Sequence, residues 1–310
     1  MNDVLARCRA YTLLGDLFQR GLTPSSKEAW GEVPLARGAL ADLPLAQAAE
    51  VHTRVVVLDL PLRASAWRSA DGLVGGDDAA DAAALLGRCG RAVGAEPDSL
   101  GNQLALLGFL SGAVLDAERD GARIPDVRLL ERQALNSLLA WLPGGVAALR
   151  AAGEPAPLYE LAAELALDLT IAHRAALGAP FDAPTLPPLP ALLDAPGTGI
   201  RAIAEYLAVP ALAGGAFARS TLIGLARDYD LPAGFGSRAD LLEGLLRSAS
   251  HYDRRSELLG ALAALATGWA ESWGALAGPL RPLGQPWRER IQITCEVFFR
   301  LAEAQPRTSP

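Results

Sequence analysis

Residues 96–120 read EPDSLGNQLALLGFLSGAVLDAERD, and from Leu100 onward this stretch has the spacing of a helix. Its apolar and small side chains recur every three or four residues and share one face: Leu100, Leu104, Leu107, Ser111 and Val114. Pro97 fits a first helical turn, where the missing N–H costs no hydrogen bond. The pattern therefore predicts a helix that includes Pro97 and runs to about Asp120.

The rest of the 310-residue chain has the same character. Hydrophobic residues make up 51% of it and aromatic residues only 6%, while Ala and Leu recur in nearly every block. This balance favours helices, because Ala and Leu have high helix propensity whereas strands prefer β-branched and aromatic residues. The β-branched run Val55–Leu58 has no second run to pair with, so we predict it to be helical as well. The sequence thus predicts an all-α fold.

Several helix ends are marked by single residues. Asp126 has the side chain of an N-cap, and Pro143 is expected to break the helix that precedes it. Ser237 and Asp240 have the spacing of a capping box. Pro286 is predicted to start the last helix of the chain.

The domain organisation follows from the length and from one shift in composition. At roughly 100–200 residues per domain, the length predicts two domains. Between residues 179 and 199 lie six prolines, which favour an extended chain and exclude a packed helix. We therefore predict a first helical domain over residues 1–179, a Pro-rich linker over 180–199 and a second helical region over 200–310.

The charge of the chain indicates its class of partner. Lys and Arg number 28 against 35 Asp and Glu, which leaves a formal net charge of −7. This excess argues against a nucleic-acid-binding protein, which normally carries a basic face, and favours a partner with positive charge. A peptide or protein is the natural candidate.

The cysteines and the chain start predict a soluble cytoplasmic protein. Cys8, Cys89 and Cys295 are far apart and form no CxxC pair, which favours a reducing compartment. The first residues carry charge throughout and lack the apolar core of a signal peptide. We find no run of 18–20 apolar residues, so we expect no stable membrane insertion.

The histidines offer little for catalysis. His52, His173 and His251 have no metal-ligand spacing such as HExxH, and they are scattered along the chain. His173 lies late in a predicted helix, where we expect it to face solvent or to cap carbonyl groups. We therefore predict no catalytic residue, no metal and no cofactor.

The acidic pair before residue 100 has two interpretations. Asp98 could simply complement the dipole of the helix that follows. Alternatively, Glu96 and Asp98 could together bind a guanidinium group beside an apolar helix. The residues alone leave both interpretations open.

At this point the chain resembles a known family. Residues 95–107, AEPDSLGNQLALL, are similar to the signature of the TorD/DmsD/NarJ-type chaperones, whose usual form is E-P-x-D-H or E-P-D-H-x-G, then E-L and an apolar run. Residues 137–143, SLLAWLP, resemble that family's H-L-x-x-W-x-P, and 159–162, YELA, resemble its next helix opening. The resemblance covers about residues 5–178. Ser99, Gln103 and Ser137 stand where the family has histidine, glutamate and histidine.

The resemblance implies a multi-helix TorD-like domain and a chaperone function. Proteins of this family bind the twin-arginine signal peptide of a precursor molybdenum-containing reductase or dehydrogenase. They hold its catalytic subunit ready for cofactor insertion before export. Carried over to this chain, the resemblance implies a signal-peptide or client-binding site with these residues: Glu96, Pro97, Asp98, Ser99, Gln103 and Trp141. We expect Glu96 and Asp98 to make the charged contact and Trp141 to shape the groove.

Two other classes of function stay open at this stage. A helical enzyme that acts on a small molecule would need titratable groups that converge in one pocket. A helical-repeat adaptor would show a clear repeat period within residues 1–180 and 200–304. Self-association, by exchange of helices across the Pro-rich linker, is also compatible with the sequence.

Overall fold

The all-α prediction is confirmed by the computed structural model, which describes residues 2–121, 123–152, 156–178, 180–190, 192 and 198–303. Within these ranges the structure contains helices, turns and one isolated antiparallel β-bridge, between Arg63 and Ser99. Residues 191 and 193–197 of the predicted linker lie outside the described residues. Residues 180–190 contain no helix, as the prolines predict.

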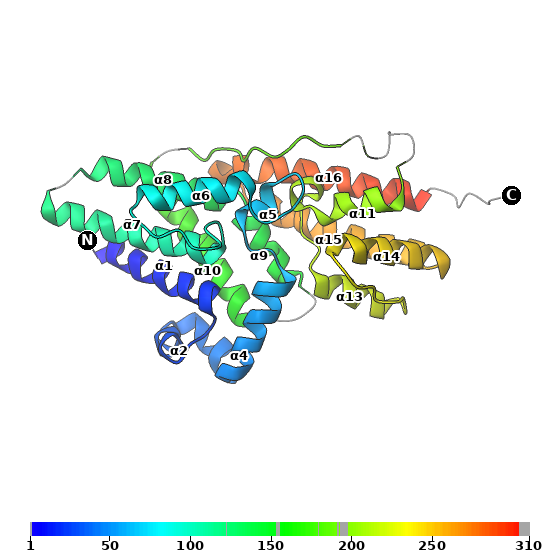
Figure 1. Cartoon of the computed structure of the whole chain (residues 1–310), viewed down its shortest axis with the longest axis horizontal. Coiled ribbons are helices and arrows are strands. Elements are labelled where there is room, and N and C mark those ends of the chain that lie inside the picture. Colours follow the sequence, from blue (N-terminus) through cyan, green and yellow to red (C-terminus); the bar gives the residue numbers. More distant parts are fainter. Residues whose placement is uncertain are drawn as a thin grey trace. The chain divides into compact units, whose positions relative to one another are not determined.

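The chain divides into two compact units (Figure 1). Unit 1 comprises Met1–Trp67, Leu73–Leu149 and Ala156–Asp182, and unit 2 comprises Arg68–Gly72, Arg150–Pro155 and Ala183–Pro310. The change from one unit to the other after Asp182 falls within the stretch predicted as a linker. Sequence reasoning did not foresee the two short segments that unit 2 takes from the first half of the chain.

The helices of the first half begin and end as follows: α1 (Asn2–Arg20), α2 (Pro24–Gly31), η1 (Pro34–Ala36), α3 (Arg37–Leu40), α4 (Leu45–Val51), the π-helix η2 (His52–Asp59), α5 (Ala64–Arg68), α6 (Gly76–Arg88), α7 (Leu100–Asp120), α8 (Ile124–Leu139), α9 (Leu142–Arg150) and α10 (Pro157–Ala176). Those of the second half are α11 (Ile200–Ala208), α12 (Pro210–Ala213), α13 (Arg219–Asp228), α14 (Arg238–His251), α15 (Arg255–Gly274), η3 (Gly278–Leu280) and α16 (Arg281–Glu303). The run Val55–Leu58 is therefore helical, in a π-helix that directly continues α4.

Helix α7 is the core helix of unit 1. The five residues predicted to share its inner face are all buried: Leu100, Leu104, Leu107, Ser111 and Val114. By length and apolarity α7 could also cross a membrane, but 61% of its most apolar window is buried inside the structure. The apolar side chains of α7 are thus mostly covered by other parts of unit 1, as expected for a core helix.

The start of α7 corrects the prediction for Pro97. Ser99 is the N-cap, and its hydroxyl accepts a hydrogen bond from the backbone N–H of Asn102. A serine at this position satisfies one of the unpaired N–H groups of the first turn. Pro97 therefore precedes the helix instead of lying in its first turn.

Two other predicted helix starts are also wrong. Helix α8 begins at Ile124, so Asp126 lies in its first turn, because Pro125 already suits that turn. Helix α16 begins at Arg281, and Pro286 lies inside it. Leu283 and Trp287, one turn apart, are both buried, and their packing offsets the hydrogen bond that the proline cannot donate. By contrast, the capping box of Ser237 and Asp240 at the start of α14 is confirmed.

Unit 2 is built around stacked aromatic side chains. The rings of Trp273 and Trp287 are parallel, with centroids 5.0 Å apart, and they join α15 to α16. The indole N–H of Trp273 donates to the carbonyl of Gly214 at 3.0 Å. Gly214 has a φ of 81°, and a Cβ there would lie 2.5 Å from Ile291, so only glycine fits this turn.

Helices α1 and α7 pack against each other with glycines at the contact, and Figure 1 shows them side by side. A Cβ added at Gly15 of α1 would lie 2.9 Å from the backbone nitrogen of Ala105. One added at Gly101 of α7 would lie 2.8 Å from the backbone nitrogen of Gln19. Both distances are too short for a real side chain. Because glycine has none, the backbones of α1 and α7 can approach each other closely at these two positions.

This contact predicts opposite effects for two glycine-to-alanine substitutions. We expect Gly15→Ala to lower the free energy of unfolding by about 1–3 kcal/mol, because the new methyl group meets the backbone of α7. Gly87→Ala is the matched control, since Gly87 lies in α6 with no atom within 4 Å of its added Cβ. That change should stabilise the protein by up to about 1 kcal/mol through helix propensity. Urea unfolding of both variants checks this, and equal shifts in the same direction would contradict the close contact.

Candidate functional site

The candidate site is an open cavity of about 330 Å³ in unit 1, which we call the Glu96 cavity. Its walls come from the end of α1, from η2 and the chain after it, and from the segment that leads into α7. The lining residues are Phe18, Gln19, His52, Val56, Val57, Leu62, Arg63, Ala95, Glu96, Ser99, Leu100, Gly101 and Asn102. The cavity thus places a carboxylate beside apolar side chains.

Backbone pairing holds one wall of this cavity in place. The N–H of Leu100 donates to the carbonyl of Leu62 at 2.9 Å, and the N–H of Ala64 donates to the carbonyl of Asp98 at 3.1 Å. These two bonds flank the β-bridge between Arg63 and Ser99. The segment that carries Glu96 is therefore fixed against the chain that leads into α5.

Glu96 is the carboxylate that faces the cavity. Its Oε1 accepts a hydrogen bond from the guanidinium of Arg63 at 2.5 Å, and its side chain remains 48% exposed. Among the residues that the structure describes, none donates a hydrogen bond to the other oxygen, Oε2. Glu96 can therefore accept a second cationic donor without losing the first.

Asp98 has a different environment from Glu96, although only Pro97 separates them. Asp98 is 1% exposed, and its Oδ2 accepts a hydrogen bond from the backbone N–H of Ser65 at 2.8 Å. The Asp98 carbonyl also accepts from the side-chain amide of Gln103 at 2.7 Å. Asp98 thus joins the start of α5 to the start of α7 from the interior.

The structure brings only part of the predicted set to one place. Glu96 and Ser99 line the cavity, whereas Pro97, Asp98, Gln103 and Trp141 are not among its lining residues. Trp141 is fully buried and stacks on Trp67 with ring centroids 6.4 Å apart. It supports the fold beneath the site instead of forming a wall of the cavity.

Sequence reasoning did not place His52 and the neighbouring valines at this site. The half-buried His52 lines the cavity, its ring lies 5.7 Å from that of Tyr159, and burial lowers its pKa. Val56 and Val57 extend from the same π-helix. The π-helix is a form found frequently at functional sites, but the run Val55–Leu58 in the sequence predicted only a helix.

A buried chain of polar side chains connects three helices of unit 1. The Tyr11 hydroxyl of α1 lies 3.2 Å from Nδ1 of His173, and Nε2 of His173 lies 3.3 Å from Oε1 of Glu131. Arg128 donates to the second oxygen of Glu131 at 2.7 Å. The prediction that His173 faces solvent or caps carbonyls is therefore wrong, because it is 1% exposed and holds α10 against α1 and α8.

The charge state of Glu131 follows from this chain. Burial favours the neutral acid, but the contacts with His173 and Arg128 outweigh it and hold the Glu131 pKa below the ordinary value of 4.5. Tyr11, Glu131 and His173 are all buried, at 0–1% exposure. The group therefore joins α1, α8 and α10 from the interior of unit 1.

This arrangement predicts an acid-sensitive contribution to stability. The ionised Glu131 stabilises the fold above pH 4.5, and that contribution is lost as the pH falls through the lower pKa of the folded state. We expect Glu131→Gln to lower the free energy of unfolding by about 1–3 kcal/mol at pH 7. The difference from wild type should shrink in urea titrations below pH 4.5. A difference that does not depend on pH would contradict the assignment.

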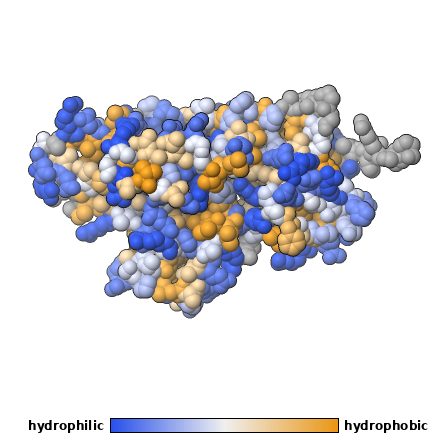
Figure 2. Space-filling model, in the orientation of Figure 1, coloured by the Kyte–Doolittle hydropathy of each residue, from blue (hydrophilic) through white to orange (hydrophobic). Residues whose placement is uncertain are grey.

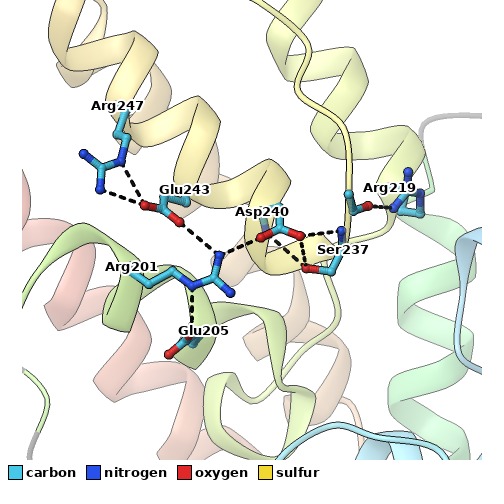
Figure 3. Close-up of polar contacts among 8 residues, drawn as sticks. Arg201, Glu205, Arg219, Ser237, Asp240, Glu243 and Arg247 are labelled. Carbon is cyan, nitrogen blue, oxygen red and sulfur yellow. Dashed lines mark hydrogen bonds and ion pairs between the residues drawn. The ribbon is translucent and has the colours of Figure 1, made fainter.

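Unit 2 carries a surface cluster of arginines and carboxylates at α11 and α14 (Figure 3). The Arg201 guanidinium donates to three carboxylates: Glu205 at 2.7 Å, Asp240 at 2.6 Å and Glu243 at 3.1 Å. Arg247 binds Oε1 of Glu243, while Arg201 binds its Oε2. One glutamate of this chain therefore holds two guanidinium groups at once, with one oxygen for each.

The cluster predicts a shifted titration of Asp240. Hydrogen bonds from Arg201 and Ser237 lower the Asp240 pKa to about 2 from the ordinary value of 3.8. We expect Arg201→Gln to raise this pKa, although not fully, since the Ser237 bonds remain. NMR titration of the Asp240 carboxyl checks the shift, with Arg254→Gln as a control at another exposed ion pair. An unchanged Asp240 pKa in Arg201→Gln would contradict the network.

No group of three or more His, Cys, Asp or Glu residues is arranged to hold a metal ion in the described part of the chain. Comparison of the sequence and structure with models of known families, curated proteins and solved structures finds no match.

Proposed function

We propose that this protein is a cytoplasmic, client-binding chaperone of the TorD/DmsD/NarJ type. Its client is the precursor of a molybdenum-containing reductase or dehydrogenase, which carries a twin-arginine signal peptide. The protein binds that peptide in the Glu96 cavity and holds the catalytic subunit until its cofactor is inserted. It acts by binding and not by turnover.

One observation carries this proposal. Within the segment that resembles the family's motif, Glu96 and residues 99–102 border an open cavity that joins a half-exposed carboxylate to an apolar wall. In the same segment Asp98 is enclosed, whereas Glu96 remains 48% exposed. An acidic residue beside apolar side chains complements a peptide in which arginine precedes apolar residues.

Glu96 supplies the charged contact in this proposal. Its Oε1 is occupied by Arg63, and its Oε2 is available to a guanidinium of the client. Glu243 of unit 2 shows that this chemistry is feasible, since its two oxygens hold two different arginines. A client arginine therefore needs to share Glu96 with Arg63 and does not need to displace it.

The apolar contact comes from the same cavity. Phe18 and Leu62 are buried at the wall, whereas Val57 is more than half exposed. Covering such exposed apolar surface contributes about 25 cal/mol per Å². The binding energy therefore has a charged part that salt weakens and an apolar part that salt leaves intact.

The proposal predicts that Glu96→Gln weakens binding of a peptide that contains Arg-Arg before an apolar run. We expect a loss of about tenfold, because a charge-assisted hydrogen bond is replaced by a neutral one. Glu50→Gln is the matched control, since Glu50 is also exposed and paired with an arginine but does not line the cavity. Fluorescence anisotropy with labelled peptide gives both affinities. Reversing the charge of Asp98 is a poor test, because the buried carboxylate also supports the fold.

Two further measurements decide the same prediction. A peptide with Gln-Gln in place of Arg-Arg should bind wild type and Glu96→Gln equally weakly. Purification from the native host should recover a molybdenum-enzyme precursor with wild type and less of it with Glu96→Gln. If Glu96→Gln and Glu50→Gln bind the Arg-Arg peptide as tightly as wild type, the proposed site is wrong. If no such precursor is recovered with wild type, the client class is wrong.

A further inference from the structure

A second hollow lies on unit 1, with a volume of about 690 Å³, and we call it the Phe109 groove. Small residues of α7, including Ala105, Gly108 and Gly112, form part of its lining. Phe109 projects beside them with 39% of its surface exposed. The glycines let α1 approach closely here, since a Cβ added at Gly108 would lie 3.0 Å from Oγ1 of Thr12. The apolar contact that this groove offers is therefore the exposed ring of Phe109.

The Phe109 groove continues the Glu96 cavity along the same three segments. On α7, the cavity ends at Asn102 and the groove begins at Ala105. On α1, the cavity uses Gln19 and the groove uses Thr12. The chain before α7 contributes Ala95 and Glu96 to the cavity and Arg91 to the groove. On each of the three segments, the nearest lining residues of the groove and of the cavity therefore lie within seven residues of each other.

Both hollows carry charged groups. At the cavity, Glu96 is half exposed and one of its oxygens is paired with Arg63. The groove carries Asp116 and Asp120, which are both paired with Arg119. It also carries Arg91, whose guanidinium lies 5.2 Å from the centre of the Phe109 ring. Glu96 is the carboxylate that borders an apolar wall, and the exposed Phe109 ring is the apolar contact of the groove.

We infer that the Glu96 cavity and the Phe109 groove are two subsites for one peptide, which places an arginine at Glu96 and an apolar side chain against Phe109. This inference rests on the proposed function and adds the register and direction of the client. The peptide runs parallel to α7, since its arginines precede its apolar residues. Ser99, which lines the cavity at the N-cap of α7, and Phe109 are ten residues apart, or about 15 Å along the helix axis at 1.5 Å per residue. An extended peptide covers this in about four or five residues.

The test uses synthetic peptides with one Arg-Arg pair, a Gly/Ser chain and a single leucine at different distances after the pair. Wild type should bind most tightly when the leucine is four or five residues after the pair. Phe109→Ala should weaken binding of that peptide about five- to tenfold and leave a version with serine in place of leucine unchanged. The matched control is Leu35→Ala, because Leu35 is also an exposed apolar residue of unit 1 but lines neither hollow.

The results separate this inference from the proposed function. If Glu96→Gln weakens binding but Phe109→Ala has no effect at any leucine position, the second subsite is wrong and the proposed site stands. If Phe109→Ala weakens the leucine and serine peptides equally, Phe109 acts through the fold and the inference also fails. If wild type binds no Arg-Arg peptide, including the longer peptide with an apolar run, the proposed function fails together with the inference.

Discussion

The backbone pairing between residues 62–64 and 98–100 is the constraint on which the candidate site depends. It joins the chain that follows η2 to the chain that starts α7, so the two walls of the Glu96 cavity cannot separate. It also separates the roles of two neighbouring acids. Asp98 faces inward, where it accepts backbone N–H groups, and Glu96 is left at the surface next to Arg63. Under the proposed function, a folding role and a binding role would thus occupy alternate residues of one short segment.

The sequence allowed the helices to be predicted better than their contacts. The face of α7 could be read from the spacing of Leu100, Leu104 and Leu107, because burial of a helix follows a local period. His173 could not be placed in this way, since its partners Tyr11 and Glu131 lie on other helices, one of them 162 residues away. Pro286 was misjudged for a similar reason, because the packing of Trp287 on Trp273 is a tertiary effect.

The candidate site was predictable only in part, and the reason is also physical. Glu96 and Ser99 belong to a segment that the sequence marked, and both line the cavity. The opposite wall comes from His52 to Arg63, whose position depends on a β-bridge that no local pattern encodes. Trp141 was expected in the groove only because residues 137–143 resemble the family's tryptophan motif. Its full burial against Trp67 shows that an aromatic residue can equally support a site from beneath.

The paired state of Glu96 has a consequence for the proposed chaperone. A carboxylate that faced the cavity without a partner would attract any cation, including the solvated lysines of unrelated proteins. Because Arg63 already neutralises part of that charge, a single cation gains little, and tight binding requires the neighbouring apolar contact as well. Specificity would then come from the combination of an arginine and an apolar segment at the correct distance. Sharing a carboxylate also keeps the charged contact weak, which suits a protein that must release its client after maturation.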